Sequence, residues 1–126
     1  MASKTLKIYV SKIGNESITI KRIKLNENNS SYKPIKKILN DGGLETIELI
    51  GGDRKNRYCL IFDDCGKINN LPINETMKKM GIKMYGNVII TKANEEGEQI
   101  DIDLDLIEIK KMIVRTVDRL YPYLKP

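Results

Sequence analysis

The 126-residue chain contains no histidine and no tryptophan, and it has only two cysteines and one phenylalanine. The absence of histidine excludes Ser-His-Asp and Cys-His nucleophiles, imidazole general bases and every histidine-containing metal site. No apolar run approaches the roughly 20 residues that a membrane-spanning helix needs. The N-terminal residues also lack the apolar core of an export signal. These absences predict a cytoplasmic protein without a membrane segment.

The two cysteines do not form a recognisable redox or zinc pattern. Cys59 lies in the segment RYCLIF, where strand alternation places it on the face opposite Tyr58 and Leu60. Cys65 follows in the turn DDCG, six positions later. This spacing fits no C-x-x-C motif. Because a lysine-rich chain without an export signal is expected in a reducing compartment, we predict two free thiols.

The positive charge is concentrated near the N-terminus. The net charge is +5, and residues 1–40 hold nine basic and two acidic side chains. A basic face favours binding of nucleic acid or another polyanion, with an ordinary solvated surface as the alternative. The stretch from Glu95 to Glu108 holds seven acidic and no basic residues. Such a stretch repels phosphate, so a polyanion-binding surface must exclude it.

Apolar periodicity predicts one α+β domain over residues 1–126. Alternating patterns predict strands at residues 5–11, 17–25, 44–50, 57–63 and 87–93. The last of these is expected to be central, because Val88, Ile89 and Ile90 are consecutive. The expected fold class is α+β, with a mainly antiparallel sheet of about five strands, two short helices and a long C-terminal helix.

Helix signals define the three predicted helices. The first covers residues 34–40, with Pro34 in its first turn and Gly42-Gly43 after its end. The second covers residues 74–81, with Asn74 as its N-cap. The third runs from about residue 103 to residue 121, and Pro122 ends it. Its apolar stripe is predicted to contain Leu106, Ile109, Ile113, Val117 and Leu120.

An aspartate run, Asp101, Asp103 and Asp105, is similar to the start of a calcium loop. That loop needs glycine at its sixth position and a carboxylate at its twelfth, but those positions hold Leu106 and Met112. The run is therefore interpreted as a polar edge and a helix start, where acidic side chains are favoured by the helix dipole. We expect no metal site and no cofactor.

Two further motifs have both a functional and a structural interpretation. Gly51-Gly52 lies beside a basic cluster that extends to Arg57, and freed backbone amides with an arginine can hold a phosphate. A tight hairpin turn explains the same glycines. Tyr85-Gly86-Asn87 offers a stacking ring and an amide at the start of the central strand. A turn before a strand uses the same residues.

The arginine pair of the last helix is the most informative feature. The chain has five arginines against seventeen lysines, and Arg115 and Arg119 are four positions apart. This spacing puts both guanidinium groups on one helix face, where they could hold two phosphates or one diphosphate. The alternative is an exposed face on which Arg115 pairs with Asp118 three positions away.

The segments GGLETIEL, YCLIFDDCGKINNLPIN, YGNVIIT and EEGE, between Gly42 and Glu108, resemble a family of small uncharacterised proteins encoded by phages and mobile elements. The small size, the basic composition and the paired helix arginines also resemble the phage Thoeris anti-defence sponge proteins. That resemblance implies a non-enzymatic protein of a bacterial host cytoplasm that sequesters cyclic ADP-ribose signals at a dimer interface. It implies ligand contacts by Arg115 and Arg119, with Asn87, Tyr85 and Arg57 as further candidates.

Three functional hypotheses follow. The first is a non-enzymatic binder of a phosphorylated nucleotide of the cyclic ADP-ribose type. The second is a phage-encoded module that binds nucleic acid or a host defence protein through the basic N-terminal hairpin. The third, an enzyme, has no paired catalytic residues in its favour. A homodimer, or a multiple of one, is expected because Ile107, Met112 and Val114 of the last helix lie outside its main apolar stripe.

Overall fold

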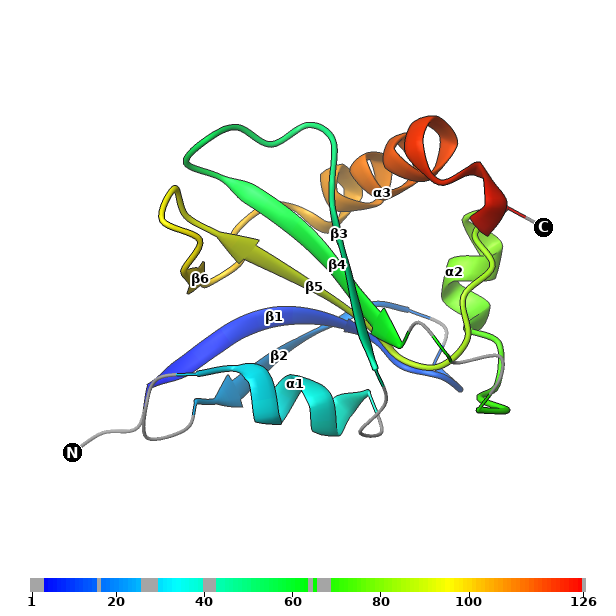
Figure 1. The fold of residues 1–126 in the computed structure, drawn as a ribbon, viewed down its shortest axis with the longest axis horizontal. Helices are drawn as coiled ribbons and strands as arrows, with labels where there is room; N and C mark the ends of the chain where they lie inside the picture. The colour runs from blue at the N-terminus through cyan, green and yellow to red at the C-terminus, as the bar shows by residue number, and fades with distance from the viewer. Residues whose placement is uncertain are drawn as a thin grey trace.

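The protein is built around a six-stranded antiparallel sheet with helices on both faces (Figure 1). The computed structural model describes residues 4–15, 17–25, 30–39, 43–63, 65 and 69–125. The strands are β1 (Thr5–Ser11), β2 (Thr19–Lys24), β3 (Leu44–Glu48), β4 (Arg57–Asp63), β5 (Val88–Ala93) and β6 (Gln99–Ile100). The helices are α1 (Tyr32–Ile38), α2 (Glu75–Lys79), α3 (Leu106–Leu120) and a 3-10 turn, η1 (Pro122–Leu124). This architecture confirms the predicted α+β class.

Strand β5 is central, as the sequence predicted. The strand order is β2-β1-β5-β4-β3. Strand β6 lies on the same edge of β5 as β1: β1 pairs with residues 88–90 of β5, and β6 pairs with residues 92–93. All six residues of β5 are buried. A strand with neighbours on both edges and cover on both faces needs apolar side chains on both sides, which explains the consecutive Val88, Ile89 and Ile90.

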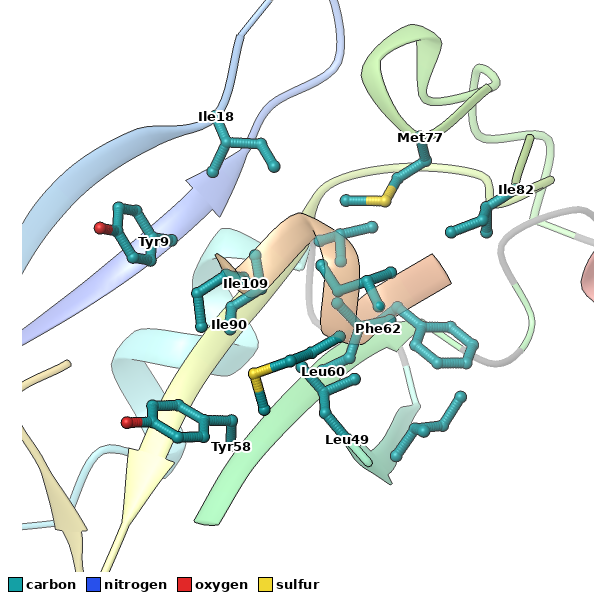
Figure 2. Packing of buried hydrophobic residues seen from close by; sticks show 14 of the residues in the cluster. Tyr9, Ile18, Leu49, Tyr58, Leu60, Phe62, Met77, Ile82, Ile90 and Ile109 are labelled. Carbon is teal, nitrogen blue, oxygen red and sulfur yellow. The ribbon is translucent and has the colours of Figure 1, made fainter. Parts of the chain in front are cut away.

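The two faces of the sheet carry separate apolar clusters. Helices α2 and α3 cover one face, and α1 covers the other (Figure 1). Figure 2 shows the larger cluster, in which Leu60 of β4, Ile90 of β5 and Ile109 of α3 pack together. The smaller cluster beneath α1 comprises Leu6, Ile8, Val10, Ile23, Ile35, Leu39, Ile61 and Ile89.

The segment before α3 is extended, which corrects the predicted helix start. Helix α3 begins at Leu106, about three residues later than expected. The preceding residues are bound to β1 instead: the Ile102 amide donates to the carbonyl of Lys7 at 3.0 Å, and the Tyr9 hydroxyl donates to the carbonyl of Leu104 at 2.9 Å. Just before this segment, the two residues of β6 pair with β5; the sequence did not predict this strand, because two residues show no periodicity.

Some predicted burial on α3 was wrong. Met112 is only 6% exposed and belongs to the larger cluster, so it is not surplus apolar surface. Leu120, expected in the buried stripe, is 56% exposed because the helix ends there and Pro122 begins η1. Ile107 is 62% exposed, as the dimer hypothesis requires, and Val114 is half-buried.

The shorter elements agree with the sequence apart from their ends. Helix α1 begins at Tyr32, so Pro34 lies in its first turn as predicted; Gly42 lies outside the described residues. β2 and β3 are shorter than expected. Asn74 is confirmed as the N-cap of α2, because its side chain accepts a hydrogen bond from the Met77 amide.

Cys59 lies on the sheet face opposite Tyr58 and Leu60, as strand alternation predicted. Its thiol is free, and burial raises its pKa. Cys65 is exposed. Among the described residues, no helix has both the length and the apolar character of a membrane-spanning segment.

Candidate functional site

The arginine pair lies on the outer surface of α3, beside a shallow hollow of about 590 Å³. We call this feature the α3 hollow. Arg115 and Arg119 are both exposed. The hollow is lined by Met80, Lys110, Lys111, Val114, Arg115, Asp118 and Arg119. Four cations therefore surround one carboxylate, which makes the hollow a candidate anion-binding site.

The local sequence explains this placement. The inner side of α3 is formed by Ile109, Met112, Ile113, Thr116 and Val117, all buried. Positions 115 and 119 fall outside this stripe, and their separation of one helical turn brings the two side chains to one side of the helix. The apolar face thus fixes the orientation of α3, and that orientation directs the arginines outward.

The Arg115–Asp118 surface pair, which the alternative interpretation proposed, is not formed. Asp118 instead pairs with Lys125, whose ammonium lies 2.5 Å from the carboxylate. Lys111 pairs with Glu108 at 3.4 Å. Within the described part of the chain, no carboxylate forms an ion pair with Arg115 or Arg119. The pairing that the alternative proposed is therefore absent, whereas its exposed helix face is observed, and both guanidinium groups are open to solvent.

The loop between β3 and β4 is held against α3 near Arg115. The Ile50 amide donates to the Thr116 hydroxyl at 2.8 Å. Gly51 has a φ of +114° and lies so close to the helix that an added Cβ would be 3.2 Å from Met112 Cγ and 3.7 Å from Arg115 Nη1. Glycine at this position therefore allows the close approach of loop and helix.

The structure favours the turn interpretation of Gly51-Gly52. An added Cβ on Gly52 would be 2.4 Å from the Asn56 carbonyl oxygen, so a side chain does not fit. The Asp53 carboxylate accepts hydrogen bonds from the amides of Lys55 and Asn56 at 2.9 and 2.8 Å, and these bonds lower the pKa of Asp53. The amides of Asp53, Lys55 and Asn56 are thus already used within the turn.

Arg57 lines a different hollow from the arginine pair, one of about 420 Å³ beside that turn. Its Nε donates to Glu48 Oε1 at 2.9 Å, and this hydrogen bond raises the pKa of Arg57. Arg54 pairs with Glu95 at 3.0 Å. The hollow contains two arginines and three carboxylates, so it does not favour an anion.

Neither Asn87 nor Tyr85 is among the described residues that line the α3 hollow. Asn87 Oδ1 accepts a hydrogen bond from the Ile13 amide at 2.8 Å, and its Nδ2 donates to the Ile38 carbonyl at 2.9 Å. The oxygen and the nitrogen of the Asn87 amide are thus both used within the fold, where they join α1 to the residues after β1. Tyr85 is half-buried and forms an isolated bridge with Ile73. Of the five candidate residues, Arg115 and Arg119 line the α3 hollow together, whereas Arg57 and Asn87 line other depressions.

Sequence reasoning missed Met80, Lys110 and Lys111 as neighbours of the pair. Lys111 is four positions before Arg115, which was an available signal. Met80 follows α2 and reaches the hollow through tertiary packing alone. Lys110 lines the same hollow, five positions before Arg115.

The aspartate run has a structural explanation. Asp101 accepts a hydrogen bond from the Lys7 amide at 2.8 Å, and Asp103 pairs with Lys92 at 2.8 Å. Asp105 precedes α3 as its N-cap residue. In the described ranges, no three histidine, cysteine, aspartate or glutamate side chains are grouped as a metal site requires.

The chain is thus an α+β protein whose sheet carries helices on both faces and whose long helix presents cations. It belongs to the family described as Domain of unknown function (DUF3846), whose model matches residues 7–116. The match includes the β1–β2 hairpin from residue 7 onward and Arg115, while Arg119 follows it. No curated protein and no solved structure matches the chain.

Proposed function

We propose that this protein is a non-enzymatic binder of a phosphorylated nucleotide, held over the α3 hollow by Arg115 and Arg119. The observation that carries the proposal is that both arginines line one hollow while no described carboxylate pairs with either. A guanidinium group binds a phosphate through two parallel hydrogen bonds, so two adjacent arginines match a diphosphate.

Other residues of the hollow suit the remainder of a nucleotide. Lys110 and Lys111 add positive charge, and Met80 and Val114 supply apolar surface for a base or a ribose. The carboxylate in the lining, Asp118, is paired with Lys125. None of the described residues that line the hollow carries a hydroxyl or thiol. This composition favours binding of the nucleotide over its cleavage.

The ligand class that we propose is a cyclic ADP-ribose-type signal. This choice rests on the resemblance to phage Thoeris anti-defence sponge proteins, and a phage-encoded protein with this activity would remove a host signal from solution. The α3 hollow is shallow and lies on the outer side of its helix, so one chain encloses a ligand incompletely. A second copy would supply the opposite wall, and the exposed Ile107 and Leu120 of α3 support a homodimer.

The decisive experiment is recovery of the bound molecule. The purified protein is incubated with cyclic ADP-ribose variants, separated from free nucleotide and heated, and the released molecule is identified by mass spectrometry. We expect intact cyclic nucleotide at one molecule or fewer per chain. Recovery of a cleaved product would indicate an enzyme, and recovery of no nucleotide would contradict the proposal.

A further inference from the structure

A second cation-lined depression lies on the other side of the sheet, between edge strand β2 and helix α1. Its volume is about 690 Å³, larger than that of the α3 hollow. We call it the basic groove. Its lining consists of Lys12, Lys21, Arg22, Ile23, Lys24, Lys33, Pro34, Lys37, Ile38 and Asn87.

The fold holds both walls of the groove in place. Ile35 and Leu39 anchor α1 in the smaller cluster, and Ile23 of β2 belongs to the same cluster. At one end, the Asn87 amide joins the Ile38 carbonyl of α1 to the Ile13 amide after β1. The groove is therefore bounded by packed elements, with Ile23, Pro34 and Ile38 as its apolar part.

The described lining of the groove carries charge of one sign. Among the residues that the structure describes there, six are lysine or arginine and none is acidic. Arg22 has one distant, solvent-exposed contact, in which its Nη1 lies 3.8 Å from an Asp101 oxygen, and such contacts are weak. No ion pair between described residues involves the five lysines. Like charges gathered without counter-charges repel one another, and a polyanion would relieve that repulsion.

We propose that the basic groove binds the sugar–phosphate backbone of a single-stranded nucleic acid. Cations from both β2 and α1 suit a ligand that carries one negative charge on every nucleotide. Five of the six are lysines, which act as point charges and favour phosphate contact without sequence preference. Pro34 and Ile38, both half-buried, offer apolar contact to bases, which a single strand exposes and a duplex hides.

The position of β2 adds neutral hydrogen-bonding groups. β2 is the last strand at its edge of the sheet and pairs with β1 alone. Every second residue of such a strand directs its backbone N–H and C=O away from the sheet. Its N–H groups can donate to phosphate oxygens beside Lys21 and Arg22. The competing ligand is an acidic peptide that pairs with β2 as a further strand of the sheet. Only every second side chain of such a strand would point toward α1, so its carboxylates would contact fewer of the cations.

The test is fluorescence anisotropy with a fluorescein-labelled 20-nucleotide oligo-dT. If about five phosphates contact lysine or arginine, affinity should fall about 100-fold between 50 and 200 mM salt. The double variant Lys21→Gln/Lys33→Gln removes two exposed cations, one from each wall. It should bind at least about tenfold more weakly at 100 mM salt and show a salt slope smaller by about 1.4.

The matched control is Lys78→Gln/Lys79→Gln, which removes two exposed lysines of α2 on the other face of the sheet. It should bind the oligonucleotide like the wild type. Thermal unfolding of both double variants checks that the fold is retained.

Three results would overturn the inference: equal binding by the groove variant and the wild type, tighter binding of a 20-base-pair duplex, or equally tight binding of labelled polyglutamate. Arg115→Ala should leave binding of the oligo-dT unchanged. Lys21→Gln/Lys33→Gln should leave binding of cyclic ADP-ribose variants at the α3 hollow unchanged. Failure at one site is therefore distinguishable from failure at the other.

Discussion

Lys92 Nζ lies 2.8 Å from the carboxylate of Asp103, and the lysine side chain is 8% exposed whereas the aspartate is 69% exposed. The lysine also lies over the Tyr58 ring, 5.8 Å from its centroid. The buried cation of the central strand is thus neutralised by a residue that reaches it from the segment before α3. This pair connects β5 to that segment.

We predict that Asp103→Asn destabilises the protein by about 1–2 kcal/mol, because a buried ammonium loses its charged partner. Lys92→Met should cost less, since it removes the buried charge itself and keeps most of the side-chain volume. Urea unfolding of both variants measures the difference. A larger loss in Lys92→Met than in Asp103→Asn would contradict this account.

The same pair predicts a dependence of stability on pH. The hydrogen bond from Lys92 lowers the pKa of Asp103 below its ordinary value of 3.8, and the hydrogen bond to Asp103 raises the pKa of Lys92 above 10.5. A lowered carboxyl pKa contributes stability above pH 3.8 that is lost as pH falls through the folded value. A raised lysine pKa contributes stability below pH 10.5 that is lost as pH rises through the folded value.

Measurement of the free energy of unfolding against pH checks this prediction. The advantage of the wild type over Asp103→Asn should be constant between pH 5 and 9 and should shrink below pH 3.8. An advantage that persists at pH 2 would show that the carboxylate charge does not contribute.

For the arginine pair, we predict that Arg115→Ala and Arg119→Ala each weaken binding of cyclic ADP-ribose variants. A charge-assisted bidentate contact contributes about 1.5–3 kcal/mol, so each dissociation constant should rise roughly ten- to a hundredfold. Arg→Lys at either position should recover only part of the loss, because an ammonium lacks the planar fork. Titration calorimetry measures these constants.

The control for this series is Lys21→Ala, because Lys21 lies in the basic groove, whereas Lys110 lines the α3 hollow itself. The control should bind nucleotide like the wild type. If both arginine variants do so as well, the nucleotide is not held by this face of α3.

We predict a homodimer that uses the exposed apolar residues of α3. Light scattering at micromolar concentration should give twice the chain mass of 14.4 kDa. Ile107→Lys or Leu120→Lys should shift the protein toward the monomer without a loss of stability, because both side chains are more than half exposed. Met112→Lys is unsuitable, since Met112 is part of the core. A wild-type particle of 14.4 kDa would contradict the prediction.

Sequence periodicity determined most of the elements because strand alternation and helix repeats depend on neighbours along the chain. Consecutive Val88, Ile89 and Ile90 predicted the central strand β5, and Asn74 predicted the start of helix α2. The structure adds that Asn74 is fully buried and that its amide also donates to the carbonyls of Ser11 and Gly86. Those contacts span the fold, so no local pattern contains them.

The spacing of Arg115 and Arg119 was likewise sufficient to place them on one side of a helix. Tertiary structure alone decided that Asp118 pairs with Lys125, that Arg57 pairs with Glu48 and that Asn87 joins α1 to β1. It also gathered cations from β2 and α1 into one groove. Periodicity fixes which face a side chain occupies, but its partner depends on elements brought together by burial of apolar surface, which acts without direction and between distant parts of the chain.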